Sequence, residues 1–215
     1  MFKTILPFAN GSVLEIGSGI GNISEFFLAH KINITLSDYD DIYISELKSR
    51  FSKYSNLGGI LKIDLQHPEF ASYYASIKNK FDTVILLNVL EHLKDDQAAL
   101  VNARFLLKQG GVIIVLTPSY QFLYSSLDKE LGHYRRYTLK KLGDIFTMNN
   151  FEIQKKFYFN LLGTLAWLYG KLLKLKSIPS GEMRFYNKLV PVGKFLDSIF
   201  FNKAGLSIIM VARKK

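Results

Sequence analysis

The fold class of this chain is decided by the stretch Val13-Leu-Glu-Ile-Gly-Ser-Gly-Ile-Gly-Asn22. Its first four residues, Val13–Ile16, are typical of a buried β-strand. The turn that follows contains three glycines, namely Gly17, Gly19 and Gly21. Glycine allows positive φ angles and lets a ligand approach the backbone closely. Residues 23–30 then have the pattern of a helix, and this order predicts the ligand-binding side of an open α/β sheet.

The spacing of the glycines narrows the choice of ligand. A dinucleotide-binding turn has the pattern G-x-G-x-x-G, but Asn22 occupies its third glycine position here. A P-loop is excluded because no Gly-Lys-Ser/Thr follows. Together with Glu15, the stretch reads E-x-G-x-G-x-G, which resembles the first motif of the class I S-adenosylmethionine-dependent methyltransferases. A glycine turn without any ligand is the alternative.

The length and composition fit one globular domain. We expect the 215 residues to form a single domain over residues 1–215. Hydrophobic residues make up 48% of the chain, which is enough for a core and argues against disorder. The absence of cysteine excludes disulfides and thiolate chemistry and favours the cytoplasm. The first ten residues lack the pattern of a secretory signal.

The net charge of +10 is concentrated in the last third of the chain. Residues 151–215 contain 12 Lys and Arg against 3 Asp and Glu. They also contain the apolar, aromatic run 157–173, and this combination favours an anionic surface as a partner. We expect a membrane surface contacted through residues 157–176 rather than nucleic acid, because no RNA-recognition module is visible. The protein would then be cytoplasmic and peripheral at the inner face of the membrane.

The run 157–173 is too short to cross a bilayer, which needs about 20 residues. An interfacial helix is one interpretation, because Trp167 and two tyrosines are interleaved with lysines. A lid helix packed on the domain's own core is the other interpretation. The two can coexist.

Short apolar runs alternate with helical patterns through the first two thirds. The predicted strands are Val13–Ile16, Ile32–Ser37, Gly59–Ile63, Thr83–Leu87 and Val112–Thr117. The predicted helices are 23–30, 41–54, 69–78 and 94–108, the last of them ended by Gly110-Gly111. Continuous apolar runs are typical of parallel strands that are covered on both faces.

After Pro118 the pattern changes. A loop-like stretch leads to Thr138, a plausible N-cap for a helix over 139–148. Two further strands are predicted at Phe151–Phe159 and Leu206–Val211. The resemblance implies a doubly wound, mostly parallel, seven-stranded α/β sheet of the Rossmann-like methyltransferase type, ending in a near-adjacent antiparallel pair. Residues 160–205 are then a helical insertion before the last strand.

The resemblance extends to residues that follow the later strands. It implies that Asp38 accepts the ribose hydroxyls of S-adenosylmethionine and that Tyr39 lies on the adenine. An acid at this place would equally suit a nicotinamide cofactor, and capping of a helix near Asp40 is the simpler role. Asp64 would accept the adenine amine, and Leu65 would donate its backbone N–H to the ring.

The fourth predicted strand leads into Asn88-Val-Leu-Glu-His-Leu93. By resemblance, Asn88 and Val89 line the methionine part of the cofactor and His92 borders the cofactor or the methyl-transfer cleft. A structural role is the alternative for His92. Glu91 is expected near a helix N-terminus, where a negative charge is favourable.

The segment 127–138 gathers polar side chains where this fold places substrate-facing loops. It contains Gly-His-Tyr-Arg-Arg-Tyr137 and resembles a G-H-x-R-R-Y element of one bacterial branch of the family. His133 is the candidate general base. The candidate substrate-binding residues are Tyr134, Arg135 and Arg136, the arginines as clamps for a phosphate or carboxylate. The alternative is an ordered loop whose arginines pair with Asp128 and Glu130.

We expect no metal site, because the four histidines are scattered along the chain without ligand spacing. The sulfonium of S-adenosylmethionine is already an activated donor, so the protein mainly has to align the reactants and exclude water. The sequence thus predicts methyl transfer to an oxygen or nitrogen of a small or lipid-linked, anionic metabolite. The alternatives are a nicotinamide oxidoreductase and a non-catalytic membrane-surface module with a degenerate cofactor fold.

Overall fold

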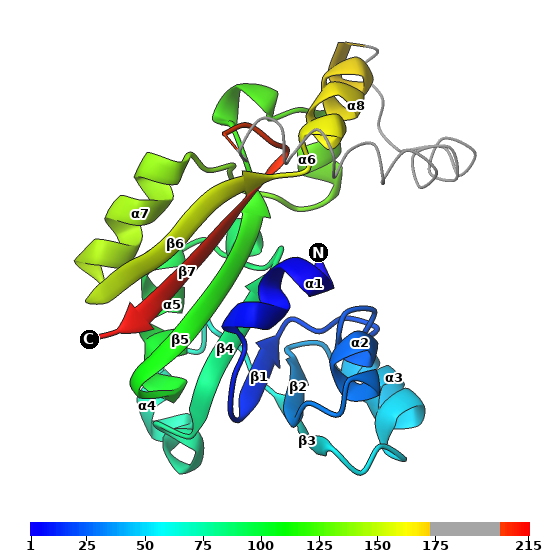
Figure 1. The fold of residues 1–215 in the computed structure, drawn as a ribbon, viewed down its shortest axis with the longest axis vertical. Helices are drawn as coiled ribbons and strands as arrows, with labels where there is room; N and C mark the ends of the chain where they lie inside the picture. Colours follow the sequence, from blue (N-terminus) through cyan, green and yellow to red (C-terminus); the bar gives the residue numbers. More distant parts are fainter. Residues whose placement is uncertain (173–202) are drawn as a thin grey trace.

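A seven-stranded sheet forms the centre of the computed structural model, which describes residues 1–172 and 203–215 (Figure 1). The strand order is β3-β2-β1-β4-β5-β7-β6. The strands are β1 (Val13–Ile16), β2 (Ile34–Asp38), β3 (Leu57–Lys62), β4 (Phe81–Leu87), β5 (Leu107–Pro118), β6 (Phe151–Phe159) and β7 (Ser207–Lys214). Strands β1 to β5 are parallel, and β7 runs antiparallel to both β5 and β6. The predicted sheet and its antiparallel end are confirmed.

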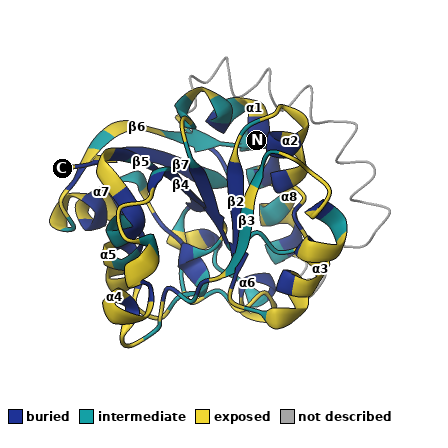
Figure 2. Cartoon of the chain, turned by 90° about the horizontal axis from the view of Figure 1, so that it is seen from below, coloured by how far each residue is buried: buried dark blue, intermediate teal, exposed yellow. Residues whose placement is uncertain are grey.

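Helices cover both faces of this sheet, which makes it doubly wound. They are α1 (Phe2–Ile5), α2 (Ser24–Ala29), α3 (Asp41–Phe51), α4 (Phe70–Tyr73), α5 (Asp96–Leu106), α6 (Ser126–Glu130), α7 (Leu139–Met148) and α8 (Leu161–Leu172). One hydrophobic cluster joins α1, α2 and α3 to one face, and a second joins α4, α5 and α7 to the other. Figure 2 shows the central strands as mostly buried, whereas the edge strands β3 and β6 are largely intermediate or exposed.

Neighbouring residues of the strands alternate between the two clusters. In β1, Val13 packs under α2 and α3, whereas Leu14 and Ile16 pack on the opposite side. Apolar residues on both parities are therefore needed, and this explains why the strands read as continuous apolar runs.

The caps of two helices follow from their first residues. Thr138 caps α7 by accepting a hydrogen bond from the backbone N–H of Lys141, as expected. Asp40 caps α3 by accepting from Ile42. The N-cap of α3 is therefore Asp40, and the simpler role considered for Asp38, that of capping this helix, does not apply.

Three local predictions need correction. The helix predicted over 69–78 is divided into α4 and a 3₁₀ turn at Ala75–Ile77, because Tyr74 turns inward and its hydroxyl accepts from the N–H of Asp64. Strand β5 begins at Leu107, before the glycine pair, and Gly110 (φ +73°) lets the chain bulge there. The stretch predicted as a loop before Thr138 contains α6 and a 3₁₀ turn at Gln121–Leu123.

The predicted insertion at 160–205 is described only in its first part. Helix α8 follows Asn160, which has a left-handed φ of +67°. Among the described residues no helix is both long and apolar enough to span a bilayer. The remainder of the insertion, residues 173–202, lies outside the described part of the chain.

Candidate functional site

A cavity of about 270 Å³ opens at the carboxyl ends of the parallel strands. Its lining comes from the ends of β1, β2, β3 and β4, where the sheet order reverses between β1 and β4. Ligands of open α/β sheets bind at such a switch point. The lining residues are Ile16, Gly17, Tyr39, Ile63, Asp64, Leu65, Gln66, Val89, His92 and Leu93.

The structure brings six of the predicted cofactor residues together in this lining, although four different loops supply them. They are Gly17, Tyr39, Asp64, Leu65, Val89 and His92. The other predicted cofactor residues, Glu15, Gly19, Gly21, Asp38 and Asn88, are not part of the lining.

Asp38 stabilises the glycine turn through its side chain. Its side chain is buried, and one carboxylate oxygen accepts from the backbone N–H of Gly19 at 2.9 Å. The other oxygen accepts from the N–H of Asp40 at 3.1 Å. A charged acceptor of two backbone hydrogen bonds holds the turn in place beside the cavity.

Glu15 lies beneath the same turn. Its carboxylate accepts hydrogen bonds from the hydroxyls of Ser24 and Ser18. Burial raises the pKa of Glu15 to about 7, although both serine hydrogen bonds act in the opposite direction. Glu15 thus supports the turn and the start of α2.

The three glycines of the turn have different surroundings, although all have positive φ. A Cβ on Gly17 would meet Cγ2 of Val89 at 2.5 Å, so this glycine lets the end of β4 approach the turn. A Cβ on Gly21 would collide with the ring of Phe51 in α3. A Cβ on Gly19 would meet open space.

Asn88 occupies a strained position at the end of β4. It is exposed and has a φ of +55°, and its backbone N–H donates to the carbonyl of Leu116 at 2.9 Å. Residues other than glycine that have a left-handed backbone are frequent at functional sites. Val89, which lines the cavity, is the next residue in the chain after Asn88.

His133 is held by a buried carboxylate. Its Nδ1 lies 2.9 Å from Oδ1 of Asp128, which is fully buried. Burial alone would raise the pKa of Asp128, but the hydrogen bonds from His133 and Arg136 keep it below its usual value. The ionised carboxylate orients the ring and keeps the proton of a neutral imidazole on Nδ1, so Nε2 carries the lone pair.

Both candidate arginines have protein partners. Arg136 is buried, donates from Nε to Asp128 at 2.8 Å and stacks on Trp167, with 4.3 Å between Cζ and the ring centroid. Arg135 pairs with Asp96 at 3.0 Å and donates to the carbonyl of Lys94. Neither guanidinium can clamp a substrate without losing a partner. The structural alternative thus holds for Arg136 with Asp128, whereas Arg135 pairs with Asp96 rather than Glu130.

Tyr134 is the exposed member of this segment. Half of its surface is accessible, at 50%, and its backbone N–H donates to the carbonyl of Glu91 at 2.8 Å. The segment around His133 is thereby tied to the turn that follows β4.

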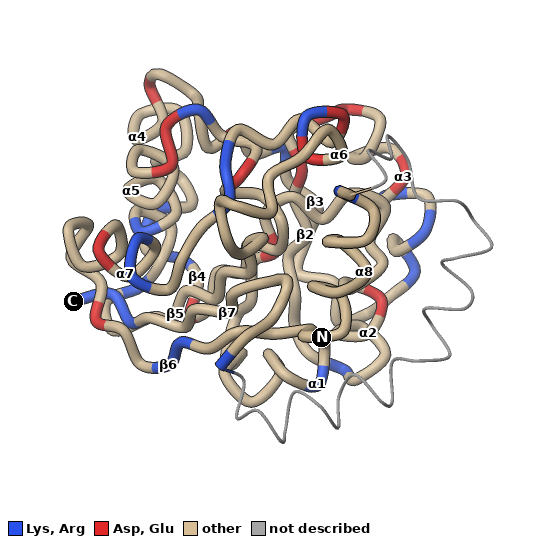
Figure 3. Tube along the Cα trace, turned by 90° about the horizontal axis from the view of Figure 1, so that it is seen from above, with Lys and Arg blue, Asp and Glu red and all other residues tan. Residues whose placement is uncertain are grey.

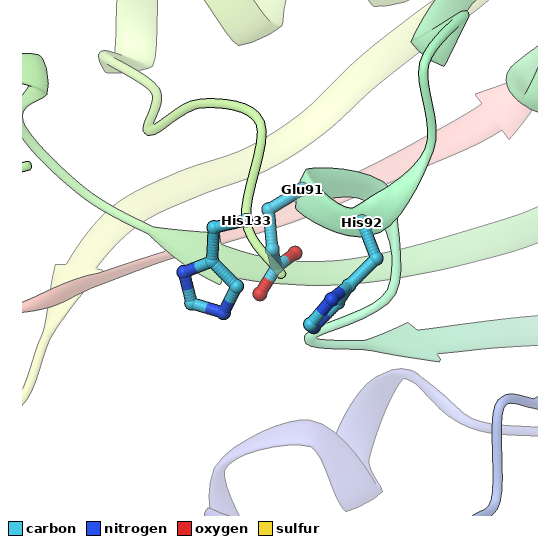
Figure 4. A group of neighbouring side chains, drawn as sticks. All are labelled: Glu91, His92 and His133. Atoms are coloured by element: carbon cyan, nitrogen blue, oxygen red, sulfur yellow. The ribbon is translucent and has the colours of Figure 1, made fainter. Parts of the chain in front are cut away.

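Glu91, His92 and His133 meet beside the cavity (Figure 4). In Figure 4 the carboxylate of Glu91 is seen beside the two imidazoles, whose rings meet edge to face with centroids 4.7 Å apart. Neither carboxylate oxygen has a hydrogen-bond partner among the described residues, and the residue is fully buried. Burial raises the pKa of Glu91 to about 8, which corrects the expectation that a negative charge is favourable here. Burial also lowers the pKa of His92, and the neighbouring His133 lowers it further.

Sequence reasoning missed part of this arrangement. The cavity also contains Ile16, Ile63, Gln66 and Leu93, which are chain neighbours of predicted residues. Asp128 was noted only as a partner for an arginine. The spacing of Glu91, His92 and His133 carries no signal of their meeting, because about 40 residues separate the first two from the third.

Comparison with known proteins points to one family. Residues 14–113 match a family model described as a methyltransferase domain. A relative from Dictyostelium discoideum, named "Probable polyketide synthase 42", is 30% identical over an alignment of 143 residues that covers 58% of this chain. The chain spans only 5% of that relative's length.

Solved structures share the whole fold. A SAM-dependent methyltransferase from Archaeoglobus fulgidus superposes with a TM-score of 0.65 at 20% identity, covering 99% of this chain and 91% of the other. Phosphoethanolamine N-methyltransferase 2 of Haemonchus contortus, in complex with S-adenosyl-L-methionine, also gives 0.65 at 17% identity, covering 99% of this chain and 52% of the other.

Proposed function

Because residues 14–113 match a methyltransferase domain and the whole fold is that of solved S-adenosylmethionine-dependent methyltransferases, we propose that the chain is a class I enzyme of this kind and methylates an oxygen or nitrogen of a small or lipid-linked metabolite. The observation that carries this proposal is the cavity at the switch point of the sheet, which six predicted cofactor residues line. The family match also sets aside the nicotinamide oxidoreductase.

The residues of the cavity suit the cofactor. Gly17 contributes no side chain to the lining, Asp64 supplies a carboxylate for the adenine amine, and Tyr39 is exposed at the rim for stacking. When bound, S-adenosylmethionine would supply a methyl group carried on a cationic sulfur. A lone pair of the acceptor would form the new bond to the methyl carbon, and the electron pair of the broken S–C bond would remain on sulfur. The chain itself has to align the acceptor and exclude water.

We propose that the acceptor binds on the side of the cavity where His92 lies, next to Glu91 and His133. His92 belongs to the cavity lining, and His133 stands 4.7 Å from it. Since Asp128 holds Nδ1 of His133, Nε2 is the atom through which this residue can act on the acceptor. An anionic acceptor was expected on account of Arg135 and Arg136, and in the structure each of these arginines pairs with a carboxylate.

The packing and the exposed apolar face of helix α8 favour the proposal of a lipid-linked acceptor. Trp167 donates to the carbonyl of Leu123 at 3.1 Å, so the helix packs over the substrate-side loops as a lid would. Its other face exposes Leu165, Leu168, Tyr169 and Leu172. We propose that this face lies on an anionic membrane surface while the inner face covers the site.

Binding of S-adenosylhomocysteine tests the cofactor assignment. Calorimetric titration of the purified protein is expected to show one site, and absence of binding at millimolar ligand would reject the proposal. The acceptor is then sought by transfer of a labelled methyl group to fractionated cell extract, with membrane lipids as a separate fraction. Binding of acidic vesicles without cofactor binding would support the non-catalytic membrane module instead.

A further inference from the structure

Three potential metal ligands converge from two distant segments. Glu91 and His92 belong to the 3₁₀ turn Leu90–His92 after β4, and His133 belongs to the loop between α6 and α7. One ligand atom of each lies within 4.8 Å of the others. Donors at about 2.1 Å from one cation are about 3 to 3.5 Å apart, so side-chain shifts of roughly one to two ångströms would close the site.

The carboxylate of Glu91 lacks the partner that its burial demands. Both oxygens are inaccessible and neither accepts a hydrogen bond from the described residues. A buried unpaired carboxylate is costly, and such groups are normally hydrogen-bonded, paired with a charge or coordinated to a metal. Arg136 is the nearby cation, but its Nε is committed to Asp128. A cation between Glu91 and the imidazoles would satisfy the carboxylate.

The imidazole of His133 is oriented as a metal ligand is. Asp128 binds its Nδ1, so the other ring nitrogen is left to coordinate. Metal-binding histidines almost always donate their second N–H to a carboxylate or carbonyl in this way. Nδ1 of His92 lies beside Gly132, 3.7 Å from the position that a Cβ on this glycine would take.

We propose that Glu91, His92 and His133 bind one divalent transition-metal cation, such as Mn²⁺ or Zn²⁺, at the edge of the cofactor cavity. Two imidazoles and one carboxylate suit these ions, and three protein ligands leave coordination positions open. The earlier expectation of no metal site rested on the scatter of the histidines along the chain, which the fold removes for His92 and His133.

The role of the cation rests on the proposed methyl transfer. An acceptor hydroxyl in an open position would be polarised, so that its proton leaves to solvent and the oxygen lone pair forms the bond to the methyl carbon. The electron pair of the broken S–C bond remains on sulfur. His133 then acts as a ligand and no longer as a general base.

Metal titration of the purified, chelator-treated full chain tests this site without relying on activity. Calorimetry with Mn²⁺ and visible absorption with Co²⁺ are expected to show one equivalent bound. Glu91→Gln and His133→Ala should each weaken binding at least tenfold. His67→Ala removes a histidine outside the cluster and should bind as the wild type does. Circular dichroism shows whether each variant is folded. If a cluster variant is not folded, His92→Asn is measured in its place.

Three results would overturn the site: no uptake, uptake of several weak equivalents, or uptake unchanged in all the cluster variants. S-adenosylhomocysteine is titrated into the same metal-free protein as a separate arm. Cofactor binding without metal uptake refutes the metal site alone. Metal uptake without cofactor binding refutes the methyltransferase proposal and leaves the metal site standing.

Discussion

Gly17 is needed for two reasons that can be separated. Its φ of +72° strains any other residue, and a Cβ would press on Val89 of the cavity lining. Gly110 has nearly the same φ, +73°, but nothing lies within 4 Å of its Cβ position. A substitution of Gly110 therefore measures the effect of backbone strain alone.

We expect Gly110→Ala to lower the free energy of unfolding by about 1–2 kcal/mol and to leave cofactor affinity unchanged. Gly17→Ala should show the same strain and also weaken S-adenosylhomocysteine binding at least tenfold, because Val89 is pushed toward the cavity. Denaturant unfolding and calorimetry measure the two effects. Equal cofactor affinity in both variants would show that the turn does not hold the ligand.

Glu15 makes stability depend on pH. Its pKa is about 7 in the folded protein against 4.5 for an unperturbed glutamate, because burial disfavours the charged form. The folded state therefore holds this proton more tightly than the unfolded chain. The stabilisation is fully present below about pH 4.5 and is lost as the pH rises through about 7.

Glu15→Gln should remove this dependence. Between pH 5 and pH 8 the wild type is expected to lose up to about 3 kcal/mol more unfolding free energy than the variant does. Denaturant titrations at the two pH values measure the difference. Glu46→Gln, which changes an exposed carboxyl on α3, serves as the control and should follow the wild type.

At the scale of elements, the loop between α6 and α7 is a structural junction as well as part of the site. Arg136 joins α6 through Asp128, the end of β5 through the carbonyl of Ser119, and α8 through Trp167. Arg135 joins the same loop to α5 through Asp96, nearer to the surface. These contacts of Arg135 and Arg136 therefore hold in place the loop that contains His133.

Arg136→Ala is expected to destabilise the fold by about 3–5 kcal/mol, because it leaves Asp128 buried without its charged partner. Arg135→Ala should cost less, about 1 kcal/mol, since its pair is partly exposed. Thermal and denaturant unfolding compare the two. The reverse order would show that Arg136 is not the brace of this loop.

At the scale of the whole molecule, charge and apolar surface are unevenly distributed. Figure 3 shows basic positions on β6 and beside the C-terminus, whereas α8 is almost uncharged. Leu165 and Leu168 of α8 are 59% and 41% exposed. An exposed apolar helix face with Lys171 in its last turn is the arrangement expected of a helix that lies on an anionic bilayer.

Co-sedimentation with vesicles of equal parts phosphatidylglycerol and phosphatidylcholine measures this contact. We expect the wild type to bind and high salt to weaken the binding, because salt screens exposed charges. Leu165→Glu with Leu168→Glu should reduce binding at least tenfold. Ile42→Glu with Met148→Glu adds the same charge at exposed apolar positions on α3 and α7 and should retain most of the binding. Equal loss in both double variants would refute the α8 contact.

Much of the fold could be predicted because its signals are local. The strand at Val13–Ile16, the helix over 139–148 and the strand at Phe151–Phe159 were predicted with the bounds that the structure has. Apolar runs, glycines and caps act between residues that are close in the chain. Boundaries failed where a distant contact decides them, as at Tyr74, whose hydroxyl is held by Asp64.

The sheet, the glycine turn and the cofactor cavity could be predicted from the sequence alone, because each depends on residue types in a short, ordered pattern. The burial of Arg136, the lack of a partner for Glu91 among the described residues and the contact of His92 with His133 are visible only in the fold. These outcomes depend on which distant segments the sheet brings together. Burial and pairing then set the charge of each group, and no spacing along the chain encodes them.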